Sequence, residues 1–239
     1  MNILLQLLLA HVITDFALQS QKLIDHKKKY RARSWFLWVH ALLAGVLSVL
    51  FLMDIKYWYV GLIISITHFF IDLWKLHKNN DNLKYFLLDQ LFHILIIIVS
   101  WLLVINGFKE VLPLFKTVLQ SNQIVGIILG YILVIFPVGF IIGRATQRWR
   151  KEVEVAGEEA SLEKAGRYIG IFERILVFTF VVTNQMAAIG FLIAAKSILR
   201  FSNKEEVNAR KQTEYVLIGT LMSFSISIVI GILVRVVSF

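Results

Sequence analysis

Residues 83–105 read LKYFLLDQLFHILIIIVSWLLVI, a run that is apolar almost throughout. At a helical rise of about 1.5 Å per residue, about 20 such residues cross the hydrocarbon core of a bilayer. Two ionisable residues, Asp89 and His93, nevertheless lie inside the run. The stretch therefore predicts a membrane-spanning helix that carries polar groups within the membrane.

Similar apolar runs recur along the chain. Of its 239 residues, 58% are hydrophobic and 17% are charged, and the mean hydropathy is +0.72. This composition is far more apolar than that of a soluble domain. We predict an all-α, polytopic helical membrane protein with about six to seven transmembrane helices. The other predicted spans cover residues 2–22, 35–53, 57–76, 124–143 and 216–237, and a further apolar region covers residues 169–195.

The basic residues fall mainly in alternate loops. The net charge is +9, but most lysines and arginines lie in the first, third and fifth loops, whereas the second loop holds only Lys56. This alternation follows the positive-inside rule, so we predict an outer amino terminus and place those three loops in the cytoplasm. Membrane orientation explains the charge, and we expect no nucleic-acid partner.

The spacing of the apolar runs predicts two parts. Residues 1–106 hold four closely spaced spans, which predict a transmembrane four-helix bundle. Residues 107–121 are a linker or a surface segment. Residues 122–239 form a second transmembrane region, with a charged cytoplasmic loop at residues 144–167.

The apolar region at residues 169–195 conflicts with the charge pattern. A single crossing there would export the basic residues from Lys196 to Lys211, against the positive-inside rule. The polar pair Asn184 and Gln185 lies near its middle. We therefore predict a re-entrant pair of half-helices that turns near these two residues, and an ordinary single span is the alternative.

Seven ionisable residues lie within the first four predicted spans, although each costs roughly 2.5 kcal/mol or more at mid-bilayer unless it is paired or hydrated. Six of them form three pairs with a spacing of four, which places both members on one helix face. Counted from the basic end of each span, all lie about 10 Å deep or one turn deeper, so antiparallel helices would bring them into one layer. They are His11, Asp15, His40, His68, Asp72, Asp89 and His93.

Imidazole and carboxylate groups together are ligands of zinc, iron and manganese. Seven such groups exceed the needs of one tetrahedral ion, so either two ions bind or some aspartates orient the histidines. We predict a metal site for one or two divalent transition-metal ions, either zinc, manganese or iron. A proton or ion pathway through the same residues and purely structural polar packing are the alternatives.

The same residues lie in motifs that resemble a known family. The chain reads HVITDFALQ at residues 11–19, THFFIDLWK at residues 67–75 and DQLFH at residues 89–93, with His40 between the first two. In combination these resemble the DUF3307 family of uncharacterised bacterial integral-membrane proteins, over about the first hundred residues. The resemblance implies a multi-pass protein of the bacterial inner (cytoplasmic) membrane, and it implies no established activity.

A second polar set lies in the C-terminal part. Lys196 and Arg200 are four residues apart on one helix face and are suited to holding a phosphate. Arg167 and Arg174 are further candidates for binding an anionic substrate. For Lys196 and Arg200, anchoring at the lipid head groups is the alternative.

A metal ion near the cytoplasmic interface is suited to activating water, so we favour a metal-dependent hydrolase. Its substrate would be phosphorylated or lipid-like, and its partners would be membrane lipids. A metal-ion or proton transporter and a non-enzymatic membrane sensor are the alternatives. A di-iron oxidase is less favoured, because membrane oxygenases of that type usually present more histidines than four.

Overall fold

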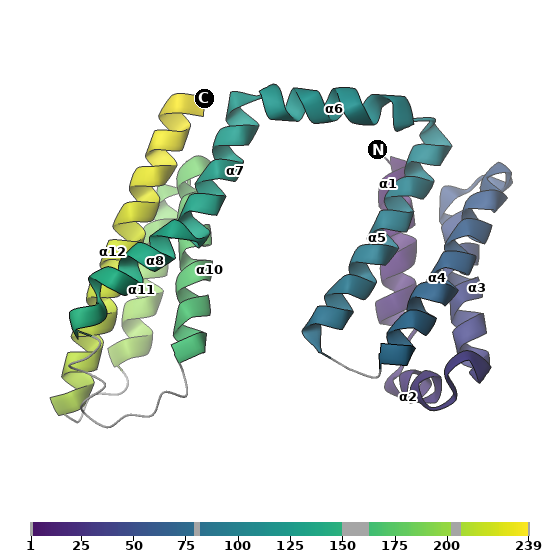
Figure 1. Cartoon of the computed structure of the whole chain (residues 1–239), viewed down its shortest axis with the longest axis horizontal. Coiled ribbons are helices and arrows are strands. Elements are labelled where there is room, and N and C mark those ends of the chain that lie inside the picture. The colour runs from purple at the N-terminus through teal and green to yellow at the C-terminus, as the bar shows by residue number, and fades with distance from the viewer. Residues whose placement is uncertain (1, 79–81, 150–162, 202–206, 239) are drawn as a thin grey trace. The chain divides into compact units, whose positions relative to one another are not determined.

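The computed structural model describes residues 2–78, 82–149, 163–201 and 207–238, and within these residues the chain is helical almost throughout and forms no strand (Figure 1). Among the described residues, five helices are long and apolar enough to cross a membrane, or six if one bent pair counts as a span. The prediction of an all-α polytopic protein is thereby confirmed. The five are Trp35–Leu52, Ile55–Lys78, Leu83–Ile105, Asn122–Ala145 and Glu214–Ser238.

The chain divides into two compact units, Met1–Pro113 and Leu114–Phe239. The boundary lies within α6 (Phe108–Gln120), in the segment that the sequence marks as a linker or surface segment. Helix α6 contains Pro113 and buries none of its residues. The two units are therefore described separately.

In unit 1, the helices α1, α3, α4 and α5 alternate in direction along the chain (Figure 1). Helix α1 packs against α3 and α5, and α4 packs against α3 and α5, so the four close into a ring. A short π-helical turn, η1, continues α1. The bounds are α1 (Asn2–Val12), η1 (Ile13–Ala17), α3 (Trp35–Leu52), α4 (Trp58–Lys78) and α5 (Leu83–Ile105).

The first span is shorter than the predicted range of residues 2–22. Its helix ends at Ala17, and the next helix, α2 (Gln21–Tyr30), is bent away by 85°. Ser20, just before α2, has an extended backbone with ψ 157°. The sequence of α2 is QKLIDHKKKY, and so polar a helix cannot continue into the hydrocarbon core.

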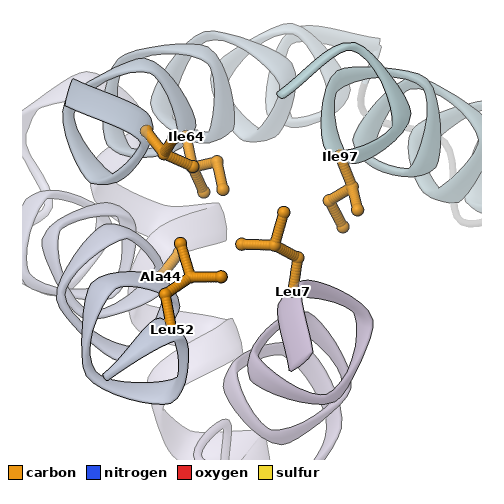
Figure 2. Packing of buried hydrophobic residues seen from close by; sticks show 6 residues of the cluster. Leu7, Ala44, Leu52, Ile64 and Ile97 are labelled. Atoms are coloured by element: carbon orange, nitrogen blue, oxygen red, sulfur yellow. The ribbon is translucent and has the colours of Figure 1, made fainter. Parts of the chain in front are cut away.

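An apolar cluster fills one half of unit 1. Leu7, Ala44, Leu52, Ile64 and Ile97 point toward one another from four helices, as Figure 2 shows. Helices α3 and α4 approach closely beside this cluster: a Cβ atom on Gly45 would overlap the backbone oxygen of Gly61. Small residues at such contacts are typical of packing between membrane helices.

Unit 2 holds α7 (Asn122–Ile135), α8 (Pro137–Ala145), α10 (Glu163–Val182), α11 (Met186–Phe201) and α12 (Val207–Ser238). Pro137 separates α7 from α8, since proline lacks the N–H group that continues a helix. Helix α10 packs against both α7 and α12. Val177, Val181, Ile189 and Phe224 form the buried core of this unit.

The chain reverses direction between α10 and α11, which lie in contact and run in opposite directions (Figure 1). Asn184 has a left-handed backbone with φ 60°, and the Gln185 N–H donates to the Phe180 oxygen at 2.7 Å, which closes the end of α10. The apolar part of α11, Met186–Ser197, is shorter than the about 20 residues that cross a bilayer. The turn lies at the polar pair from which we predicted re-entry, and re-entry into the membrane itself stays a prediction.

Candidate metal centre

All seven predicted ligands come together inside the ring of unit 1. None of their side chains is more than 8% exposed. Helix α1 with η1, helix α4 and helix α5 each supply one pair, and α3 supplies the seventh residue, His40. The seven residues form three groups that share members, and within each group one ligand atom from every residue lies within 4.8 Å of the others. The groups are His11, Asp15 and His68; His40, His68 and Asp72; and Asp72, Asp89 and His93.

Three ligand atoms form a compact triangle. Asp15 Oδ1 lies 3.4 Å from His40 Nε2 and 3.3 Å from His68 Nε2, and the two Nε2 atoms lie 3.0 Å apart. Ligands that each lie about 2.0–2.1 Å from one ion are about 2.8–3.0 Å from each other in octahedral geometry and about 3.3–3.4 Å in tetrahedral geometry. The triangle therefore has the size of one face of a metal coordination shell.

The carboxylate at the corner of this triangle lacks a hydrogen bond. Asp15 Oδ1 is buried, and within the described part of the chain no group donates to it. Asp89 Oδ1 and His93 Nε2, in the same layer, are also buried without a hydrogen-bond partner among the described residues. Buried polar atoms nearly always have a hydrogen-bond partner, so three such atoms without one in the same layer are typical of a ligand-binding site.

The other four groups are arranged more loosely around the triangle. Asp72 Oδ2 lies 3.7 Å from His40 Nε2, and Asp72 Oδ1 lies 3.9 Å from His93 Nε2. The His11 and His93 rings stack with their centroids 5.1 Å apart. Asp72 is thus placed to join the triangle as a fourth ligand or to bridge toward a second ion.

Four further polar residues contact this layer, and none of them was predicted from the sequence as a site residue. Lys27 Nζ donates to Asp72 Oδ2 and Lys75 Nζ donates to Asp89 Oδ2, both at 2.7 Å. The Gln19 amide nitrogen lies 2.8 Å from His40 Nε2, and the Gln90 amide donates to Asp15 Oδ2 at 3.2 Å.

Three of the four stand inside the motifs quoted above. Gln19 ends HVITDFALQ, Lys75 ends THFFIDLWK, and Gln90 follows Asp89 in DQLFH. Their places in these motifs were a signal that the sequence analysis did not use. Lys27 lies in the run DHKKKY, where nothing distinguishes it from Lys28 and Lys29.

The apolar cluster of unit 1 closes one side of the layer. Each histidine has a cluster residue four positions away on the same helix face: Leu7 for His11, Ala44 for His40, Ile64 for His68 and Ile97 for His93. Figure 2 shows these four apolar side chains meeting at the centre of the ring. A cavity of about 10 Å³ lies between Ala44, Ile64 and Ile97 and the histidines His11, His68 and His93, which is room for about one water molecule.

The opposite side of the layer is polar. It faces α2 and the end of α4, which carry basic residues of the first and third loops. The Lys27 side chain is 7% exposed, whereas the Lys75 side chain is 35% exposed and connects the buried aspartates to the surface. Lys27 and Lys75, which donate to the buried carboxylates Asp72 and Asp89, thus lie on this side of the layer.

The four candidates for anion binding in unit 2, Arg167, Arg174, Lys196 and Arg200, differ from one another in burial and in hydrogen-bond partners. Arg174 is buried, and its guanidinium donates to the backbone oxygens of Val134 and Ile135, beside the break at Pro137. Lys196 Nζ pairs with Glu173 Oε2 at 2.6 Å. Arg167 is exposed on α10, and the Arg200 side chain lies outside the described residues.

Residues 3–121 match the model of a family described as a protein of unknown function, DUF3307. This part of the chain belongs to the DUF3307 family. The match covers all seven ligand candidates together with Lys27 and Lys75, so the resemblance expected from the motifs is confirmed. No curated protein and no solved structure matches the chain.

Proposed function

We propose that unit 1 binds a divalent transition metal, with Asp15, His40 and His68 as the primary ligands. The observation that carries the proposal is the triangle of ligand atoms with edges of 3.0, 3.3 and 3.4 Å. The unsatisfied Asp15 Oδ1 supports it, because a buried carboxylate oxygen without a donor is costly unless a cation compensates it.

Two imidazoles and one carboxylate suit zinc, manganese or iron, and they leave coordination positions for other groups. Asp72 is a candidate for a fourth position. The looser set of Asp72, Asp89 and His93 would either bind a second ion or orient the ligands of the first ion without binding it.

For the activity, we propose a metal-dependent hydrolase. A metal of this kind supplies an acidified water as nucleophile and polarises the bond to be cleaved. The approach from the polar side favours this reading over a transporter, which would need a polar route to both faces. Here the cluster around Leu7, Ile64 and Ile97 closes the other side.

The substrate would be phosphorylated or lipid-like, because the layer lies one or two helical turns from the membrane surface that carries the basic loops. We place the protein in the bacterial inner membrane, with membrane lipids as partners. Arg167, Arg174, Lys196 and Arg200 stay candidates for holding an anionic head group in unit 2. A non-enzymatic sensor would use the same metal to fix one arrangement of the helices.

The metal is tested by the His68→Ala and His40→Ala variants, purified without chelator and supplied with zinc, manganese or iron. We expect one or two ions per chain in the unaltered protein and loss of at least one ion in either variant. His77→Ala is the matched control, since His77 lies on the same helix as His68 but is exposed and bonds the Leu73 oxygen. Equal metal content in all four proteins would refute the site.

The activity is tested on the metal-loaded protein with a panel of phospholipids and polyprenyl phosphates in detergent. Turnover that stops on chelation, and that the His68→Ala variant lacks, would support the hydrolase. Uptake of labelled metal into proteoliposomes would instead support the transporter. Metal binding with neither result would favour the sensor.

A further inference from the structure

Two lysines supply positive charge to the layer of ligand candidates. Lys27 is the only residue that α2 buries. A helix normally docks through apolar side chains, whereas this one inserts an ammonium that reaches Asp72 Oδ2 at 2.7 Å. Lys75, from the last turns of α4, reaches Asp89 Oδ2 at the same distance.

The charge balance of the layer depends on the metal. Three aspartates and two lysines, with neutral histidines, leave one net negative charge. A divalent ion reverses this to one net positive charge. Inside a low-dielectric bundle an uncompensated charge is costly, so the metal-loaded layer calls for an anion.

Groups that can hold an anion are already present on the polar side. A lysine ammonium carries three N–H donors, and within the described residues each of these two forms one hydrogen bond. The amide nitrogen of Gln90 donates to both Asp15 Oδ2 and Asp89 Oδ2, and so holds these two carboxylates in the layer. The Lys75 side chain is 35% exposed, so this lysine extends from the buried Asp89 to the surface.

We infer that Lys27 and Lys75 form an oxyanion site beside the metal, and that this site takes the phosphate group of the substrate. The inference rests on the proposed metal site and narrows its substrate class to phosphate esters. A metal ion with two ammonium groups is the combination that compensates the charge of a phosphoryl oxygen. A neutral ester would leave the layer with its net positive charge.

The inference predicts that metal and phosphate bind cooperatively. The probe is inorganic phosphate, titrated calorimetrically into the detergent-solubilised full-length protein, with and without bound zinc. We expect phosphate to bind the zinc-loaded protein and to bind the metal-free protein at least about tenfold more weakly. Equal phosphate affinity in the two forms would overturn the inference.

The lysines are tested by Lys27→Met and Lys75→Met in zinc-loaded protein. We expect unchanged zinc content and about tenfold or greater loss of phosphate affinity in each. The matched controls are Lys29→Met on α2 and Lys78→Met on α4, both exposed, which should bind phosphate normally. If Lys27→Met fails to fold, Lys27→Arg should keep the site, and Lys75→Met still tests it.

The outcomes separate this inference from the metal proposal. Zinc bound without any phosphate affinity, or with phosphate affinity that both lysine variants retain, overturns the oxyanion site alone. Failure to bind zinc overturns both. Phosphatidic acid in detergent is a second probe: tighter binding than inorganic phosphate assigns the oxyanion to a lipid, and equal binding assigns it to a soluble phosphate ester.

Discussion

Replacing Lys27 with methionine removes the ammonium that lies 2.7 Å from Asp72 Oδ2 and leaves a buried carboxylate on Asp72. Breaking a buried ion pair in this way costs about 3–5 kcal/mol. We expect the lower end, about 3 kcal/mol, because His40 Nε2 at 3.7 Å and His93 Nε2 at 3.9 Å stay near Asp72. The loss applies to the metal-free protein.

The assay is unfolding of the metal-free protein in mixed micelles, followed by helical circular dichroism. Lys29→Met is the control and should change the free energy of unfolding by less than about 0.5 kcal/mol. The double variant Lys27→Met with Asp72→Asn removes both charges, so it should recover most of the lost stability. Zinc should stabilise Lys27→Met more than the unaltered protein, because the ion replaces the missing positive charge.

Two results would refute this reasoning. Lys27→Met as stable as Lys29→Met would mean that the ion pair contributes nothing to holding α2 on the bundle. A double variant as unstable as Lys27→Met alone would mean that the loss comes from packing of the lysine stem rather than from the charge left on Asp72.

Three further predictions concern packing and topology. Gly45→Ala should destabilise the protein by about 1–3 kcal/mol in the same assay, because its Cβ would overlap α4, whereas Gly143→Ala, which meets no atom within 4 Å, should not. Arg174→Met should cost about 1–3 kcal/mol, since the buried backbone oxygen of Val134 and the partly buried one of Ile135 lose their donor. Single cysteines at Gly166 and Glu214 should both resist an impermeant thiol reagent in intact cells if α10 and α11 re-enter the membrane, and labelling at position 214 alone would show a crossing.

The ligand candidates could be found from the sequence because two simple rules place them. A spacing of four puts His68 and Asp72 on one face of a helix, and equal depth in antiparallel spans puts such faces in one layer. His40 has no partner in its own helix, so only the depth argument includes it. Both rules depend on helical geometry and membrane thickness, which vary little among proteins.

The lysines were missed for a physical reason. Lys27 is one of six basic residues in the first loop, and a charge pattern reports which side of the membrane a loop occupies, not which side chain turns inward. That depends on the break at residues 18–20 and on the direction of α2 after it, neither of which periodicity encodes. Lys75 lies near the end of the predicted span at residues 57–76, where a charge pattern counts it with the basic residues of the third loop, although it follows Asp72 by about one helical turn.

The central claim is that Asp15, His40 and His68 together bind one metal ion. X-ray absorption fine structure of the zinc-loaded protein tests this most directly, because imidazole ligands give a characteristic outer-shell scattering. We predict a zinc shell at about 2.0–2.1 Å with two or more histidines, reduced by one histidine in His40→Ala and unchanged in His77→Ala. A shell of oxygen ligands only, or one that is identical in His40→Ala and the unaltered protein, would contradict the account.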